Sequence, residues 1–139
     1  MANTKVKGCG FHHVALQTKD IDASLRFYTE GLGFTLRAKW KTDSGTEIAL
    51  LDIGNGSYFE LFSDGEPSEK TAPKAGSFFH LALSVADTRQ AFDRAVASGG
   101  VPHVAPKEVV LGENEEIRAA LSFVLGPDGE QIEFFQEHA

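Results

Sequence analysis

The residues with the clearest chemical potential in this 139-residue chain are histidines and glutamates that recur in two similar segments. The segment "HVALQTKD" (13–20) aligns with "HLALSVAD" (80–87), so His13 corresponds to His80 and Asp20 to Asp87. Both pairs are 67 positions apart, and Gly33 and Gly100 share that offset. Three landmarks at one offset indicate two homologous modules of about 60 residues each.

One glutamate lies in the apolar segment that closes each module, "SYFELF" (57–62) and "EQIEFFQ" (130–136). Successive strand residues face opposite sides of a sheet, and the apolar side must cover the helix. This alternation places His13 and Glu60 on the face of module one that points away from its helix. It places His80 and Glu133 on the same face of module two. The small residues Ala15 and Ala82 leave room beside the histidines.

A charged carboxylate on an apolar strand is costly unless it is paired or bound to a cation. If the two faces turn toward one centre, two imidazoles and two carboxylates surround it. The pattern therefore predicts one divalent metal ion (Ni, Co, Zn, Mn or Fe) and no organic cofactor. The alternative for each residue alone is a structural histidine, or a glutamate on an exposed strand face. His103 and His138 lack the symmetry, and we expect them at the surface or in a lid.

Each module reads as a β-α-β-β-β unit, which predicts an α+β fold of two βαβββ modules. Asp20 and Asp87 are the expected helix N-caps, and Gly31 the expected stop of the first helix. His12 is expected on the helix side of its strand, near the strand's end where it can reach water. The expected domain is 11–136, with module one (11–62), a polar linker (63–76) and module two (77–136). The expected helices are 21–31 and 88–100, and the expected later strands are 34–40, 47–54, 57–62, 101–105, 117–126 and 130–136, with a tight turn at 126–129 and a lid or surface loop at 106–116.

Composition limits the classes of partner. The chain is 42% apolar and 24% charged, which is typical of a soluble globular protein. Its net charge of −7 argues against nucleic acid or an anionic membrane as a partner. The single cysteine, Cys9, excludes an internal disulfide, and no signal peptide or membrane span is evident. We therefore expect a cytoplasmic protein that acts on a small molecule.

These segments resemble the vicinal oxygen chelate superfamily, which includes glyoxalase I, bleomycin-resistance proteins and extradiol dioxygenases. The resemblance covers residues 11–136 and is carried by "HHVALQTKDIDASLRFYTEGLGF", "YFELF", "HLALSVAD" and "GPDGEQIEFF". It implies paired modules that form a cup-shaped sheet around a metal, often completed in a homodimer. The family's four ligand positions match His13, Glu60, His80 and Glu133 one by one. This set is most similar to that of glyoxalase I.

The resemblance also implies a reaction. A glyoxalase I-like lyase or isomerase acts on a small substrate with vicinal oxygens through an enediolate-type proton shuttle. Glu133 is then the first choice as catalytic base, with Glu60 as its partner on the opposite side. Glyoxalase I proteins usually carry Arg four residues after the first ligand, where this chain has Gln17, so the substrate stays open. Gln17, Tyr58 and Phe135 are the expected substrate-pocket residues.

Other members of the superfamily remain alternatives. A ring-cleaving dioxygenase or a thiol transferase of the fosfomycin type uses three protein ligands, and Glu60 would be a fourth. An epimerase resembling the methylmalonyl-CoA enzyme usually has Gln at the position of Glu60. A drug-binding protein of the bleomycin-resistance kind typically lacks the ligand set. The sequence does not decide whether the modules pair within one chain or between two chains.

Overall fold

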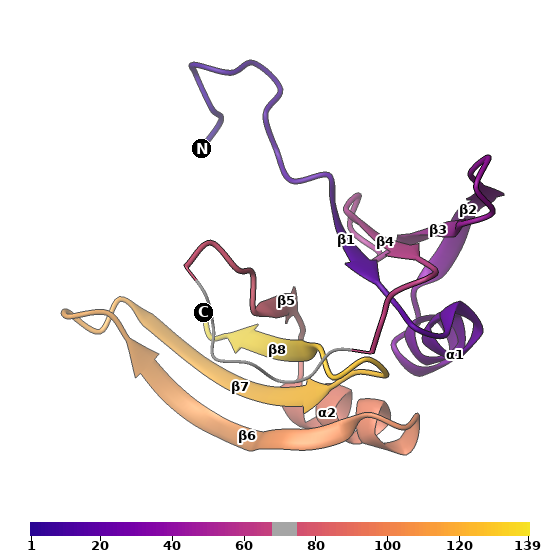
Figure 1. Cartoon of the computed structure of the whole chain (residues 1–139). Coiled ribbons are helices and arrows are strands. Elements are labelled where there is room, and N and C mark those ends of the chain that lie inside the picture. Colours follow the sequence, from indigo (N-terminus) through magenta and orange to yellow (C-terminus); the bar gives the residue numbers. More distant parts are fainter. Residues whose placement is uncertain (68–74) are drawn as a thin grey trace.

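The computed structural model describes residues 1–67 and 75–139 as two sheets, each with helical structure on one face (Figure 1). The order of elements confirms the predicted α+β fold of two βαβββ modules. Module one contains β1 (His13–Gln17), α1 (Ile21–Arg26), the π-helical turn η1 (Phe27–Gly31), β2 (Thr35–Lys41), β3 (Glu47–Asp52) and β4 (Tyr58–Phe62). Module two contains β5 (His80–Ser84), α2 (Thr88–Ala97), β6 (Val101–Leu111), β7 (Ile117–Leu125) and β8 (Gln131–Glu137).

The two sheets have the same topology. Their strand orders are β1-β4-β3-β2 and β5-β8-β7-β6, and the first strand of each module runs parallel to the last. Ala15 is the register partner of Glu60, and Ala82 is the register partner of Glu133. Register partners in neighbouring strands point to the same side of a sheet. Glu60 therefore lies on the same face as His13, and Glu133 lies on the same face as His80.

The apolar faces of both sheets contribute to one core. Phe59 and Leu61 of β4, and Ile132 and Phe134 of β8, are at most 3% exposed, as the alternation predicts. Asp20 and Asp87 accept hydrogen bonds from Ala23 N and Gln90 N, which confirms both predicted N-caps. The core cluster contains residues of both modules, so the modules pack through their helical sides.

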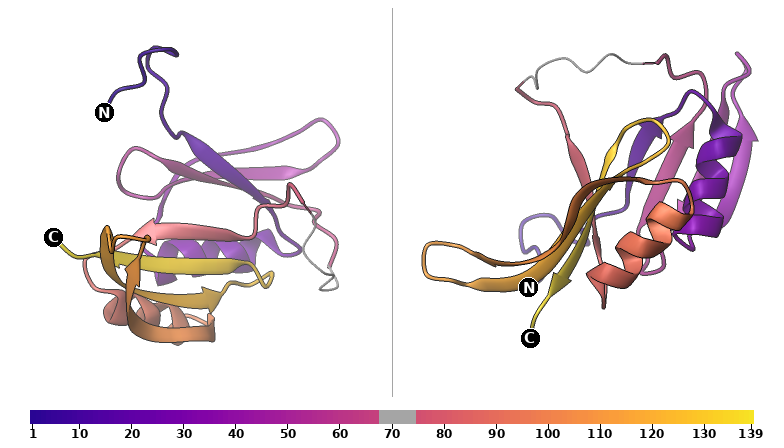
Figure 2. Two further views of the ribbon diagram at one scale, coloured as in Figure 1. Left: turned by 90° about the vertical axis from the view of Figure 1, so that its left-hand side faces the viewer. Right: turned by 90° about the horizontal axis from the view of Figure 1, so that it is seen from below.

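The helices meet at a close contact between equivalent positions of the modules (Figure 2). A Cβ atom on Gly31 would lie 2.7 Å from the Cβ of Ser98, and these residues are again 67 positions apart. Arg94 Nε donates a hydrogen bond to the Gly31 carbonyl oxygen at 2.8 Å. Gly31 ends η1, as the predicted stop requires, but its small size is also needed for contact between the modules.

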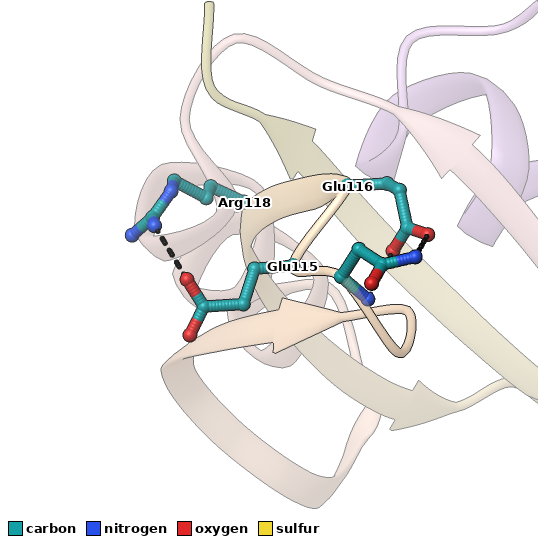
Figure 3. A network of polar contacts seen from close by, with 4 residues as sticks. Glu115, Glu116 and Arg118 are labelled. Carbon is teal, nitrogen blue, oxygen red and sulfur yellow. Dashed lines mark hydrogen bonds and ion pairs between the residues drawn. The ribbon is translucent and has the colours of Figure 1, made fainter.

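Two predictions about chain segments need correction. The first helix is not one regular helix, because α1 ends at Arg26 and a π-helical turn follows. Segment 106–116 is not a lid or loop throughout, because β6 extends to Leu111 and pairs with β7 in a long hairpin (Figure 1). Figure 3 shows the polar contacts at its turn, where Arg118 pairs with Glu115 at 3.0 Å. Part of linker 63–76 lies outside the described residues, at 68–74.

Within residues 1–67 and 75–139, no helix is long and apolar enough to cross a membrane.

Candidate metal centre

Half-site one consists of His13 on β1 and Glu60 on β4. The parallel pairing of β1 with β4 places both side chains on the face opposite the helix. His13 Nε2 lies 3.7 Å from Glu60 Oε1. The His13 side chain is 42% exposed and that of Glu60 15% exposed, so the pair opens toward solvent through its histidine.

Half-site two consists of His80 on β5 and Glu133 on β8. The β5–β8 pairing repeats that of β1 with β4, and His80 Nε2 lies 3.3 Å from Glu133 Oε2. The two side chains are 31% and 10% exposed. Among the described residues, Glu133 is the one charged residue that is buried. A nitrogen and a carboxylate oxygen at this separation form a donor set that suits a divalent cation, which would also offset the cost of burying the carboxylate.

The four predicted ligands form two pairs and not a single cluster within one chain. Among the described residues, no group of three or more His, Cys, Asp or Glu side chains is placed to hold a metal ion. Each module therefore presents a two-residue half-site. The complete ligand set stays a prediction, and it requires the faces of two modules to be brought together.

The surroundings of the two histidines differ. His12 Nδ1 lies 2.8 Å from His13 Nδ1, and the His12 ring packs against Tyr58 with centroids 5.1 Å apart. His12 is exposed, as expected, but its ring packs on Tyr58 on the face of Glu60 and not on the helix side, because His12 precedes the first residue of β1. In module two the neighbour of His80 is Phe79, whose ring meets the imidazole edge-on at 4.6 Å.

The three predicted substrate-pocket residues lie on both modules. Gln17 is exposed at the end of β1, and Tyr58 and Phe135 are half-buried in β4 and β8. The guanidinium of Arg37 lies 4.6 Å from the Tyr58 ring centroid. Sequence reasoning did not identify Arg37, because its position on a face depends on a register shift in β2 between Leu36 and Ala38. The role of the three residues in a pocket stays a prediction.

The remaining histidines lie at the surface, as expected. His103 is exposed at the start of β6, and His138 is exposed near the C-terminus. His138 Nε2 lies 2.8 Å from Glu108 Oε2, so this imidazole is already paired.

A cavity of about 620 Å³ lies between the modules and is mainly apolar. Its walls include Val14 and Leu16 of β1 and His80 and Leu81 of β5. Three phenylalanines at its edge are largely exposed, with Phe11 at 66%, Phe78 at 97% and Phe79 at 67%. Sequence reasoning missed this feature, although Phe11 and Phe78 share the offset of 67. Exposed aromatic side chains therefore lie at equivalent positions of the two modules.

A polar cluster joins the modules at the turn between β7 and β8. Tyr28 OH donates to Glu130 Oε1 at 2.6 Å, and Asp128 N donates to Glu130 Oε2 at 2.8 Å. Asp128 in turn accepts hydrogen bonds from Lys19 N at 3.0 Å and the Ser24 hydroxyl at 3.3 Å. The sequence "GPDG" predicts this turn, but the partners more than a hundred residues away could not be inferred from it.

Burial dominates the electrostatics of this cluster. It raises the pKa of Glu130, although the hydrogen bond from Tyr28 acts in the opposite direction. The pKa of the Tyr28 hydroxyl is raised well above its usual value, first by burial and then by the charge of Glu130. Tyr28 therefore remains a neutral donor, and its hydrogen bond compensates in part for the partial burial of the Glu130 carboxylate.

Comparison with known proteins identifies a family, relatives and solved structures that this chain is similar to. Residues 10–134 match the Glyoxalase/Bleomycin resistance protein/Dioxygenase superfamily. A Vibrio cholerae protein named probable lactoylglutathione lyase is 30% identical over 128 residues, covering 89% of this chain and 88% of the relative. The uncharacterized protein YaeR of Escherichia coli is 33% identical over 136 residues, covering 91% and 95%. A solved glyoxalase family protein from Enterococcus faecalis superposes with a TM-score of 0.74 at 23% identity, covering 94% and 99%.

Proposed function

The chain belongs to the glyoxalase/bleomycin resistance protein/dioxygenase superfamily, and we propose that it is a metal-dependent, glyoxalase I-like lyase or isomerase. Its substrate would be a small molecule with oxygens on adjacent carbons. The observation that carries this proposal is the pair of matched half-sites, His13 with Glu60 and His80 with Glu133. The name of the Vibrio cholerae relative points to the same reaction class.

The proposed ligands of the divalent ion are the two imidazoles and the two carboxylates of the half-sites. When bound, such an ion supplies Lewis-acid polarisation of substrate oxygens and stabilises negative charge that develops on them. The chain supplies the proton transfer. Glu133 would take the carbon-bound proton and return it to the neighbouring carbon, and its low exposure limits competition from water. Glu60 stands at the equivalent position for the opposite side of the substrate.

The complete site would form in a homodimer. Half-site one of one protomer would face half-site two of the other, so two identical sites would form per dimer. Two observations support this arrangement. The half-sites of one chain do not combine among the described residues. The exposed Phe11, Phe78 and Phe79 provide apolar area near the first strands of both modules that a second copy would cover.

Mixing two inactive variants tests the proposal directly. One chain carries H13A and E60A, the other carries H80A and E133A, and different affinity tags allow the mixed dimer to be isolated. Each variant alone should bind no metal. The mixed dimer should bind one metal ion per two chains, because one of its two sites then combines an intact half-site from each chain.

The wild-type dimer, with two metal ions per two chains, is the matched control for this experiment. If the mixed dimer binds no metal although wild type does, the half-sites do not combine across chains. If wild type itself binds no divalent metal after chelation and reloading, the proposed metal function is wrong.

The substrate requires a separate assay. Turnover of the methylglyoxal–glutathione adduct is measured with Ni²⁺, Co²⁺, Zn²⁺, Mn²⁺ and Fe²⁺. Gln17 carries no positive charge that could pair with a substrate carboxylate, so we expect a high KM for the glutathione adduct. A Gln17→Arg variant should lower this KM. Absence of turnover with every ion would exclude the glutathione adduct while leaving the metal site to be tested by binding.

A second candidate is sequestration of an apolar small molecule without metal. The cavity of about 620 Å³ and its aromatic rim favour this function. Tight binding of apolar ligands that is unchanged by EDTA, together with the absence of metal binding by wild type, would support it over the enzyme.

A further inference from the structure

We infer that His12 is a positioning residue that accepts the Nδ1 hydrogen of His13 and thereby holds His13 Nε2 free as a metal ligand. The inference deepens the proposed function and rests on it for the role of Nε2. Its basis is the separation of 2.8 Å between the two Nδ1 atoms. At that distance, when both rings are neutral, one Nδ1 atom carries a hydrogen and the other accepts it. Two Nδ1 atoms that both carry hydrogen would repel each other, and two without hydrogen could form no bond.

The geometry around His13 decides which ring should carry that hydrogen. His13 Nε2 lies 3.7 Å from Glu60 Oε1, too far for a hydrogen bond but on the side where the ion is proposed. An imidazole that binds a metal through Nε2 carries its hydrogen on Nδ1 and donates it to an outer partner. His12 Nδ1 is the partner that the described residues provide at this atom.

His12 is itself held in place. The Tyr58 backbone N donates to the His12 carbonyl oxygen at 2.8 Å, and the His12 ring packs on the Tyr58 ring. Tyr58 is flanked in turn by the Arg37 guanidinium. These contacts fix the acceptor before any ion arrives, which lowers the cost of orienting the ligand.

Module two provides a natural comparison. The residue equivalent to His12 is Phe79, which packs edge-on against His80 and offers no acceptor. The substitution His12→Phe therefore places a phenylalanine before His13, as Phe79 stands before His80 in module two. His12→Asn keeps an acceptor atom near the position of Nδ1 but removes the ring. His138→Phe is the matched control, because it makes the same exchange at an exposed histidine that pairs with Glu108, outside both half-sites.

The test records ring-nitrogen chemical shifts of His13 in the metal-free protein at roughly pH 8, above the usual histidine pKa of about 6.5. We expect wild type, His12→Asn and His138→Phe to hold the hydrogen of His13 on Nδ1. We expect His12→Phe to shift His13 to the Nε2–H form. In calorimetric titrations with Zn²⁺ or Ni²⁺, His12→Phe should lose roughly 10- to 100-fold in affinity. His12→Asn and His138→Phe should stay within roughly threefold of wild type, below that range.

Two results would overturn the inference. One is an Nε2–H form of His13 in wild type, and the other is an equal loss of metal affinity in His12→Phe and His12→Asn, which would indicate a packing role. The shift measurement needs no metal. A wild-type protein that binds no ion would therefore overturn the proposed function, while the shifts would still decide whether His12 sets the tautomer of His13.

Discussion

The two half-sites have the same backbone frame and different surroundings. Both combine a histidine of the first strand with a glutamate of the last strand, in equivalent registers. In module one the imidazole–carboxylate distance is 3.7 Å, and a second imidazole contacts the histidine. In module two the distance is 3.3 Å, the carboxylate is more buried, and phenylalanines flank the histidine. The two modules thus share the histidine and the glutamate, whereas the side chains around them differ.

Because of this difference, we expect the two half-sites to have different roles in the proposed site. Half-site two offers the less hydrated carboxylate, as expected of a catalytic base. Half-site one offers the histidine with an oriented hydrogen bond, as expected of a firmly held ligand. The predictions below test whether the two half-sites differ in function as they do in surroundings.

The largest effect is expected at the glutamates. Glu133→Gln should lower kcat by roughly 10²- to 10⁴-fold, because it removes the proposed base, and Glu60→Gln should lower it less. Metal content of both variants is measured beside turnover, so that loss of the ion is distinguished from loss of the base. Equal losses of kcat at equal metal content would show that the two carboxylates are interchangeable.

The next effect concerns the contact between modules. Tyr28→Phe removes the donor to the partly buried Glu130, and the free energy of unfolding at pH 7 should fall by about 1–3 kcal/mol. Tyr58→Phe is the matched control, because its hydroxyl has no hydrogen bond among the described side chains, and it should change stability little. Urea denaturation of both variants measures the difference.

The pH dependence of this loss follows from the raised pKa of Glu130. A carboxyl whose folded pKa lies above its ordinary value of 4.5 binds more protons when folded, so its contribution to stability is present at low pH and lost as pH rises through the folded pKa. Without the Tyr28 hydrogen bond the folded pKa rises further. The deficit of Tyr28→Phe should therefore shrink on acidification toward pH 4.5. A deficit that grows on acidification would contradict this account.

The helix caps should respond alike in the two modules. Asp20→Ala and Asp87→Ala each remove one hydrogen bond to the first turn of a helix, at 3.0 and 3.1 Å. Each should lower the free energy of unfolding by about 1 kcal/mol. If chemical denaturation finds only one cap important, the modules differ in their local folding as well as in their half-sites.

The smallest effect is expected in the turn of the hairpin formed by β6 and β7. Glu115 and Arg118 are 66% and 63% exposed and form an ion pair at 3.0 Å (Figure 3). Arg118→Ala should change the free energy of unfolding by no more than about 0.5 kcal/mol, and added salt should reduce the change. Thermal denaturation at low and high salt checks this.

The sequence by itself determined the local structure and the face of each key residue. The repeat of 67 positions predicted two similar modules, and strand alternation predicted that His13 and Glu60, or His80 and Glu133, share a face. These inferences succeed because strand periodicity and N-capping depend on residues near one another in the chain. Alternation failed at His12, where the strand had not yet begun.

Tertiary structure decided how the modules meet. The bond from Tyr28 to Glu130 and the close approach of Gly31 to Ser98 join residues far apart in sequence, and no local pattern encodes them. These contacts pack the modules through their helical sides and leave each half-site as a separate pair within the chain. Local periodicity thus sets which way a side chain points, whereas packing of complete elements sets what it faces.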